Sequence, residues 1–267
     1  MRAAILGILA AGVFASAAHG QWERARDASV RWSREGTPAL SAPAPRVRGK
    51  LDLSGTWAPD SEPLPPDIPS IEGELPLPRY MIDIAADLKP EEVPFQPWAA
   101  EFFSARLEKG EESPIAYCKP TGVPWINSIV LPYKIVQTSR LLLVLYEENT
   151  VFRQIFLDGR RPVERPVPRW MGYSTGRWEG DELIVDTVGF NDQSWLDGVG
   201  HPHTERLHVI ERFRRPDAGH LEIETTVDDP GAYTKPIVFT VKATLVTEDD
   251  LLEYFCTENE KDAERYH

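Results

Sequence analysis

Two segments near the C-terminal end of the chain, residues 220–229 (HLEIETTVDD) and 237–246 (IVFTVKATLV), alternate apolar and polar residues with a period of two. Such alternation is typical of β-strands with one buried face, because successive strand side chains point to opposite sides. Apolar runs bounded by turn residues predict further strands over 51–57, 134–139, 141–148, 150–157, 176–190 (two strands around a Glu179-Gly180-Asp181 turn), 207–213 and 251–256. About eight to ten strands with short turns predict a mainly β fold, either one antiparallel β-barrel or a strongly curved sheet.

The first 50 residues are expected to lie outside this fold. Residues 1–20 combine Arg2, an apolar run over 3–17 and a small-x-small ending, which predicts a secretory signal peptide and a periplasmic or secreted protein. Residues 21–50 are charged and rich in Pro and Ala, which predicts a flexible arm. Residues 51–267 are then expected to form a single β-rich domain.

A proline-rich segment and one helix are expected in addition to the predicted strands. Residues 59–78 hold so many prolines that we expect an extended wrap rather than a helix or a central strand. From Phe95 onward a helix is expected, with Pro97 in its first turn and Gly110 as its stop signal.

Charge and cysteine content restrict the partners. The formal net charge is −13, which argues against nucleic acid as a partner because nucleic-acid binding needs basic patches. No later segment has the roughly 20 apolar residues of a membrane-spanning helix, so no membrane insertion is expected. Cys118 and Cys256 are either a disulfide, which suits an exported chain, or two separate buried thiols. The oligomeric state cannot be read from these features.

Two resemblances add to this picture. The Gly-Thr-Trp of residues 55–57, followed by a strand meander, resembles the opening of lipocalin-like barrels and implies a cavity-forming fold. The segments PFQPWAAEFF, FLDGRRP, MGYSTGRWEGDELIVDTVGFND, ERFRRPDAG, DDPGAYTKP and EYFCTENE look like a widespread family of exported bacterial proteins. That family has no assigned reaction, so this resemblance implies export and one integrated domain and carries over no catalytic residue.

A histidine cluster is the first candidate site. In an extended His-x-His segment the imidazoles of His201 and His203 point to one side, and with Glu205 they predict a divalent metal site or a catalytic centre. The alternative is that these are loop histidines that only form hydrogen bonds. No cofactor other than such a metal is expected, because the chain has neither a P-loop nor a dinucleotide fingerprint.

A buried pair of charges is the second candidate. Strand alternation places Arg153 on the same face as Val151 and Ile155, and Glu211 on the same face as Val209 and Phe213. Buried charges need partners, so the two residues are expected to pair inside the barrel or to lie together at its mouth. They would form either a structural ion pair or an anion-binding arginine with a general base.

Acids and aromatic rings around residue 185 form the third candidate. Asp186 lies within an apolar strand and Tyr173 precedes it, and both are candidates for proton transfer. The candidates for ligand contact are Trp178, Trp195, Asn191 and Asp192. The competing interpretation for Asn191 and Asp192 is ordinary turn chemistry, whereas Asp186 is expected to line a cavity if it is functional.

These sites predict an exported enzyme, a lyase or a hydrolase, that uses general acid/base groups on a small molecule in a barrel cavity. The catalytic candidates are His201, His203, Glu211, Arg153, Asp186 and Tyr173. The alternative is a periplasmic small-molecule binding protein without catalysis, and a third reading is an interaction module that uses residues 59–78 to recruit a partner.

Overall fold

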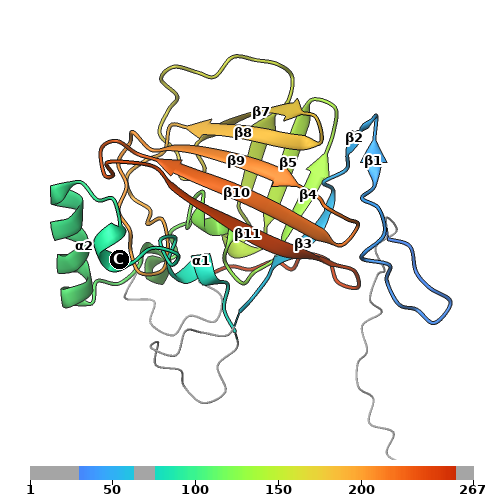
Figure 1. Ribbon diagram of the computed structural model, residues 1–267, viewed down its shortest axis with the longest axis horizontal. Helices are drawn as coiled ribbons and strands as arrows, with labels where there is room; N and C mark the ends of the chain where they lie inside the picture. The colour runs from blue at the N-terminus through green and yellow to red at the C-terminus, as the bar shows by residue number, and fades with distance from the viewer. Residues whose placement is uncertain (1–29, 63–75, 257–267) are drawn as a thin grey trace, which may run out of the picture.

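Nine strands of the described chain close into a barrel, in the order β10-β11-β3-β4-β5-β6-β7-β8-β9 (Figure 1). The computed structural model describes residues 30–62 and 76–256. The barrel strands are β3 (Gly55–Pro59), β4 (Tyr133–Gln137), β5 (Leu141–Tyr146), β6 (Phe152–Phe156), β7 (Tyr173–Glu179), β8 (Glu182–Val188), β9 (His208–Arg214), β10 (His220–Asp228) and β11 (Ile237–Val246). The prediction of a mainly β, lipocalin-like barrel is confirmed.

Shorter elements surround the barrel. They are β1 (Arg46–Val47), β2 (Lys50–Leu51), α1 (Arg79–Ile82), α2 (Pro97–Lys109) and the 3-10 helices η1 (Pro90–Glu92), η2 (Pro114–Tyr117), η3 (Trp125–Asn127) and η4 (Glu148–Thr150). The expected helix is α2. It begins at Pro97, whose missing N–H is not needed in a first turn, and it ends at Gly110, which adopts the left-handed conformation with a φ of 60°.

Alternation along the strands separates the interior from the surface. In β10 and β11 each second residue is buried over the whole length of the strand. Large buried side chains, among them Trp57, Tyr133 and Phe213, fill the interior. This side-chain filling means that the barrel interior is a packed core, as in other small barrels.

One junction departs from the antiparallel pattern. Strands β6 and β7 run parallel and share the pairs Ile155↔Ser174 and Phe156↔Thr175. Parallel neighbours need a connection that returns to the starting end of the sheet. The segment 157–172 makes this return, and it is the long loop above the barrel in Figure 1. It brings residues 169–172 beside the first half of β6, where β7 does not pair.

The segment 251–256 does not form the predicted strand. A closed barrel has no free edge to accept another strand, so this segment crosses the surface instead. The Lys134 ammonium lies 2.7 Å from the Asp250 carboxylate, and Thr150 donates to the backbone carbonyl of Tyr254 at 3.2 Å. The segment ends in a disulfide between Cys256 and Cys118, which confirms that alternative for the two cysteines.

Part of the predicted flexible arm is attached to the barrel. The backbone N–H groups of Ala218 and Gly219 donate to the carbonyls of Ala42 and Leu40 at 2.8 and 2.7 Å. These bonds hold residues 40–42 against the turn between β9 and β10, and Arg46 pairs with Asp181 in the turn between β7 and β8 at 2.5 Å. The predicted signal peptide, residues 21–29 of the arm and most of the proline-rich wrap (63–75) lie outside the described residues. Within the described ranges, no helix has the length and apolar character required to cross a bilayer.

Candidate functional site

Arg153 of β6 and Glu211 of β9 form an ion pair inside the barrel. Their exposed fractions are 2% and 0%. The Arg153 Nη1 donates to the Glu211 Oε1 at 3.1 Å, and its Nη2 donates to the Glu211 Oε2. Burial alone would lower the pKa of Arg153, but the Glu211 carboxylate more than compensates and raises it. The expectation that the two charges pair inside the barrel is therefore confirmed.

Neighbouring side chains use the other polar atoms of this pair. The Arg153 Nε donates to the Ser174 hydroxyl at 3.0 Å, and its Nη2 donates to the Thr187 hydroxyl at 2.8 Å. The Asn127 side-chain amide donates to the Glu211 Oε1 at 2.7 Å. The hydrogen-bonding atoms of both charged groups are thus satisfied by protein partners. This favours a structural role for the pair over the general-base role suggested by the sequence.

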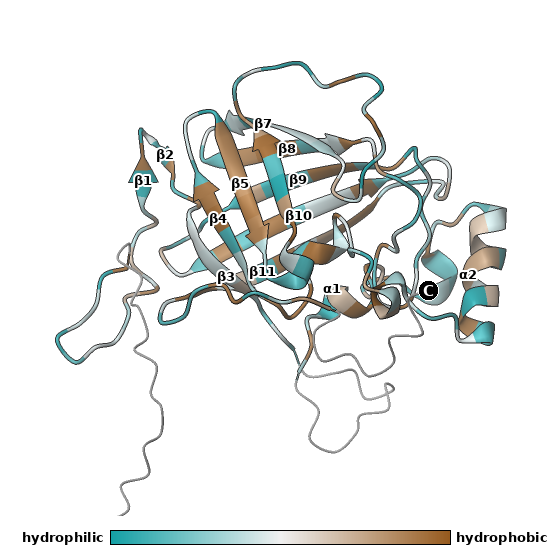
Figure 2. Cartoon of the chain, turned by 180° about the vertical axis from the view of Figure 1, so that it is seen from behind, coloured by the Kyte–Doolittle hydropathy of each residue, from teal (hydrophilic) through white to brown (hydrophobic). Residues whose placement is uncertain are grey.

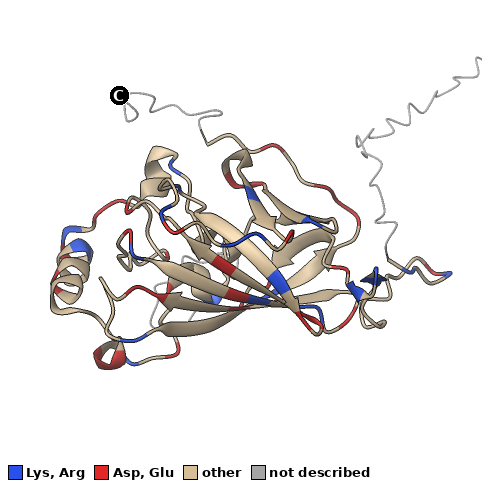
Figure 3. Ribbon diagram, turned by 90° about the horizontal axis from the view of Figure 1, so that it is seen from above, with Lys and Arg blue, Asp and Glu red and all other residues tan. Residues whose placement is uncertain are grey.

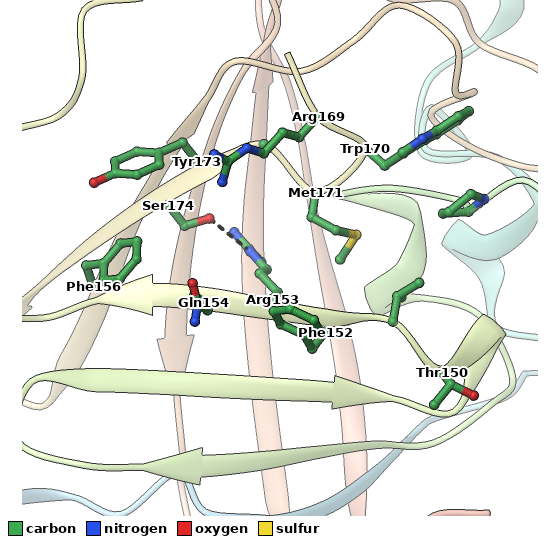
Figure 4. A pocket seen from close by; sticks show the side chains of 13 residues that line it. Thr150, Phe152, Arg153, Gln154, Phe156, Arg169, Trp170, Met171, Tyr173 and Ser174 are labelled. Carbon is green, nitrogen blue, oxygen red and sulfur yellow. Dashed lines mark hydrogen bonds between the residues drawn. The ribbon is translucent and has the colours of Figure 1, made fainter. Parts of the chain in front are cut away.

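A cavity of about 410 Å³ opens in the barrel wall where β6 and β7 separate (Figure 4). We call it the wall cavity. Its side chains come from β6, from the start of β7 and from the returning segment, and they include Phe152, Phe156, Arg169, Trp170, Met171 and Tyr173. Its volume falls in the range of about 300–1,000 Å³ that is usual for small-molecule sites. Glycine is required at position 172, because its φ is +60° and a Cβ there would lie 2.7 Å from a Thr187 methyl group.

Two arginines lie at the edge of the wall cavity, and they differ in their side-chain partners. The Arg160 guanidinium is held by Asp158 at 2.6 Å, donates to the Tyr173 hydroxyl at 3.3 Å and lies 3.7 Å above the Phe156 ring. Asp158 also lies 3.8 Å from the Arg140 guanidinium, so one carboxylate serves two arginines. The Arg169 side chain is exposed, points toward Tyr173 in Figure 4, and has no side-chain hydrogen bond or ion pair within residues 30–62 and 76–256. The wall cavity therefore combines aromatic walls with an arginine, Arg169, whose side chain has no partner among the described residues.

His201 occupies a different place, beneath α2. Its Nδ1 lies 2.6 Å from the Asp197 Oδ2, and the same Asp197 oxygen accepts the Ile84 N–H at 2.8 Å. The His201 ring stacks on Phe103 of α2 and on Phe95, with centroid separations of 4.5 and 5.4 Å. Because Nδ1–H donates to Asp197, Nε2 is the remaining polar atom. This buried Nε2 has no partner among the described residues.

The environment of His201 is that of a general acid or base. Burial opposes its protonation, but the Asp197 carboxylate, aided by Asp83, raises the pKa of His201. A carboxylate that fixes one imidazole nitrogen and leaves the other available is the arrangement of many acid/base histidines. His201 is only 2% exposed, so its Nε2 is not accessible to a substrate in this structure.

The predicted metal ligands are not brought together. Glu205 is exposed, His203 pairs elsewhere, and the one metal-type group within the described residues consists of Asp83, Asp197 and His201. Two ligands of a tetrahedral zinc ion with bonds of about 2.1 Å stand well over 3 Å apart. The His201–Asp197 separation of 2.6 Å is instead that of a hydrogen bond, so this arrangement does not fit a metal at Nδ1.

His203 pairs with Ser194, a residue that the sequence reading did not select. The His203 Nε2 lies 2.8 Å from the Ser194 Oγ, and its Nδ1 lies 3.2 Å from the Thr204 carbonyl oxygen. Burial lowers the pKa of His203, which favours the neutral ring that donates from Nδ1 and accepts the serine proton at Nε2. Both side chains are buried. The pair resembles an activated serine in geometry without access for a substrate.

Asp186 lies on the outer face of the barrel, away from both places. Its carboxylate accepts a hydrogen bond from His208 at 3.0 Å. That hydrogen bond lowers the pKa of Asp186 and raises the pKa of His208. The pair is a half-exposed surface contact between β8 and β9.

The predicted ligand-contacting residues are also dispersed, since Trp178, Trp195, Asn191 and Asp192 are absent from the lining of the wall cavity. The Arg106 guanidinium covers the Trp195 ring, 4.3 Å from its centroid. Asn191 accepts the Gln193 N–H at 3.2 Å in a local turn. Of the predicted site residues, Tyr173 and Arg153 line the wall cavity.

Sequence reasoning missed the cation of this cavity. Arg169 belongs to RRPVERPVPRW, residues 160–170, which reads as a solvated proline-rich loop. Its position depends on the parallel β6–β7 junction, for which the local pattern holds no signal.

Comparisons with known proteins bring no independent assignment, because neither a protein-family model, nor a curated protein, nor a solved structure matches this chain.

Proposed function

We propose that the protein binds a small organic anion with a flat apolar body in the wall cavity. One observation carries this proposal: the uncompensated Arg169 guanidinium stands at a cavity with aromatic walls. Ligand sites are typically apolar clefts with a few polar groups that fix orientation. A planar guanidinium is well suited to a carboxylate, which it binds through two parallel hydrogen bonds.

The remaining lining supports the same ligand class. Phe152 and Trp170 offer ring faces for stacking, and Met171 adapts its shape to an apolar surface. The Tyr173 hydroxyl, which already accepts from Arg160, can donate to a ligand oxygen. The Cys118–Cys256 disulfide supports the expectation that this binding takes place outside the cytoplasm.

Calorimetric titration with phenylacetate and with the uncharged phenylacetamide tests the proposal. We expect the wild type to bind phenylacetate at least tenfold more tightly than the amide. Arg169→Ala should abolish this preference, and Arg169→Lys should restore part of it. Arg177→Ala is the matched control, because it removes an exposed arginine of β7 that lies outside the wall cavity. Equal affinities of the wild type and Arg169→Ala for phenylacetate would refute the proposal.

A second candidate is general acid/base catalysis at His201, favoured by its buried and unpartnered Nε2. A panel of aryl esters and aryl phosphates, assayed with the wild type, His201→Gln and Asp197→Asn, tests it. Turnover that falls at least a hundredfold in both variants, while both keep the wild-type fold by circular dichroism, would support catalysis. Turnover that survives in both folded variants would rule His201 out.

A further inference from the structure

The outer face of β4, β5 and β6 is apolar where a barrel surface is normally polar. Leu142, Val144 and Tyr146 of β5 point inward and are buried, yet the outward residues between them are leucines as well. We call this face the leucine face. It consists of Val136, Leu141, Leu143, Leu145, Phe152 and Phe156, with one exposed polar residue, Gln154, between the two phenylalanines.

Strand register joins these side chains into one surface. Leu143 pairs with Val136 on β4, and Leu145 pairs with Phe152 on β6. Phe152 is 59% exposed and Val136 is 41% exposed. Figure 2 shows the apolar colour along β5 at the front of the barrel. The three leucines are half-buried, and a contiguous apolar patch on a protein surface usually marks a binding surface.

The opposite wall shows that this composition is specific to one side. Outward residues of β8, β9 and β10 form a network of ion pairs, in which Arg214 contacts Glu182 at 2.6 Å and Glu224 at 3.3 Å. Figure 3 shows such charged residues on neighbouring strands. The polar wall follows the usual alternation of antiparallel sheets, with apolar side chains inside and polar ones outside, and the leucine face breaks it.

The leucine face and the wall cavity are continuous. Phe152 and Phe156 belong to the face and also line the cavity. Arg169 stands at the cavity end of this surface. At the far side of β4 the Lys134 ammonium is neutralised by Asp250. Arg140 and Arg160 share Asp158 at the Phe156 end, so Arg169 is the arginine of the wall cavity that has no side-chain partner among the described residues. It lies next to an apolar area about 10 Å wide and about 20 Å long, as estimated from strand spacing and rise per residue.

We infer that the leucine face holds the hydrocarbon tail of an anionic amphiphile, such as a fatty-acid carboxylate, whose head group occupies the wall cavity. This inference rests on the proposed function and specifies its ligand. A cavity with aromatic walls and an arginine at its edge, continuous with a flat apolar strip, matches a single molecule with a charged head and an apolar tail. Charge complementarity places the head at Arg169 and the tail across β6 and β5.

A series of alkanoates tests the tail site separately from the head site. Affinities for hexanoate, octanoate and decanoate are measured by calorimetry below their micelle concentrations. Each buried methylene should tighten binding about threefold to fourfold. Leu143→Thr should flatten this dependence and leave the affinity for phenylacetate unchanged. Val238→Thr is the matched control, because Val238 is an exposed β-strand residue of β11, at 57%, and its variant should keep the wild-type dependence.

The outcomes separate the two proposals. Phenylacetate binding without any dependence on alkanoate length would overturn the tail site and leave the proposed function intact. No binding of any carboxylate would overturn both. Two further experiments test other occupants of the leucine face: sedimentation velocity tests for a second copy of the chain, and flotation with phosphatidylglycerol vesicles tests for a membrane. Self-association, or vesicle binding, that is lost in Leu143→Thr but kept in Val238→Thr would assign the leucine face to a second copy or to a membrane and overturn the inference.

Discussion

The guanidinium of Arg153 and the carboxylate of Glu211 meet inside the barrel through two hydrogen bonds, and neither side chain is more than 2% exposed. Replacing one partner of such a pair destabilises the folded protein far more than replacing both, because a single substitution leaves an uncompensated buried charge. The Asn127, Ser174 and Thr187 contacts add to this effect, since they too would lose a partner.

We therefore expect Glu211→Leu alone to lower the free energy of unfolding by about 3–5 kcal/mol. The double variant Arg153→Met/Glu211→Leu should lose less than the sum of the two single variants, which makes the coupling energy favourable. Urea unfolding of the four proteins, followed by fluorescence, measures this cycle. Strictly additive losses would contradict the interpretation that the two charges act as one unit.

The disulfide gives a second prediction. Cys118 and Cys256 are separated by 138 positions, so their bond restricts a long loop in the unfolded chain. Cys118→Ser/Cys256→Ser should lower the free energy of unfolding by about 2–5 kcal/mol. Reduction of the wild type should produce the same loss, and the double variant should be insensitive to reductant. A wild type whose urea midpoint does not change on reduction would contradict this expectation.

Strand parity and local stop signals explain which parts of the fold could be predicted. The interior positions of Arg153 and Glu211 follow from a period of two, which is a local property of the sequence. The bounds of α2 follow from Pro97 and Gly110, whose backbone restrictions are equally local. Local patterns of this kind hold wherever tertiary contacts do not oppose them.

The missed features depend on contacts between distant segments. Residues 251–256 have the composition of a strand, but closure of the barrel by β3 and β11 leaves no edge for them. Arg169 lies beside Phe152 only because β6 and β7 run parallel. Asp197 belongs to a loop rich in turn residues, and its contact with His201 cannot be distinguished in the sequence from an ordinary turn. No local pattern encodes these relationships.

Glu148 gives a prediction about pH. It is 4% exposed, its Oε2 has no partner within the described residues, and burial raises its pKa from 4.5 to about 7. A carboxyl group with a raised pKa in the folded state favours folding below pH 4.5, and this contribution is lost as the pH rises toward 7. Glu148→Gln removes the ionisation and keeps an oxygen for the Asn149 amide, which donates at 2.8 Å.

The variant Glu148→Gln should therefore exceed the wild type in free energy of unfolding by about 2–3 kcal/mol at pH 8. At pH 4 the two proteins should be nearly equal. Urea unfolding at both pH values measures the difference, with Glu147→Gln, a change at the adjacent residue, as the control. A difference of the same size at both pH values would show that folding does not raise the pKa of Glu148, and would contradict this prediction.

The Asp197–His201 contact gives a second prediction about pH, in which the variant is less stable than the wild type. The pKa of His201 is raised in the folded protein because Asp197, aided by Asp83, outweighs burial. A histidine with a raised pKa adds stability that is fully present below its unfolded pKa of about 6.5 and is lost as the pH rises through the folded value. Asp197→Asn removes the negative charge, so its loss of stability should be larger at pH 5.5 than at pH 9. Urea midpoints at the two pH values, together with the histidine Cε1–H titration followed by NMR, measure both effects.

A His201 resonance that titrates below pH 6.5 in the wild type would overturn the assigned ion pair. A stability loss in Asp197→Asn that does not change with pH would show that Asp197 acts only through its backbone contacts to Ile84 and Gly200.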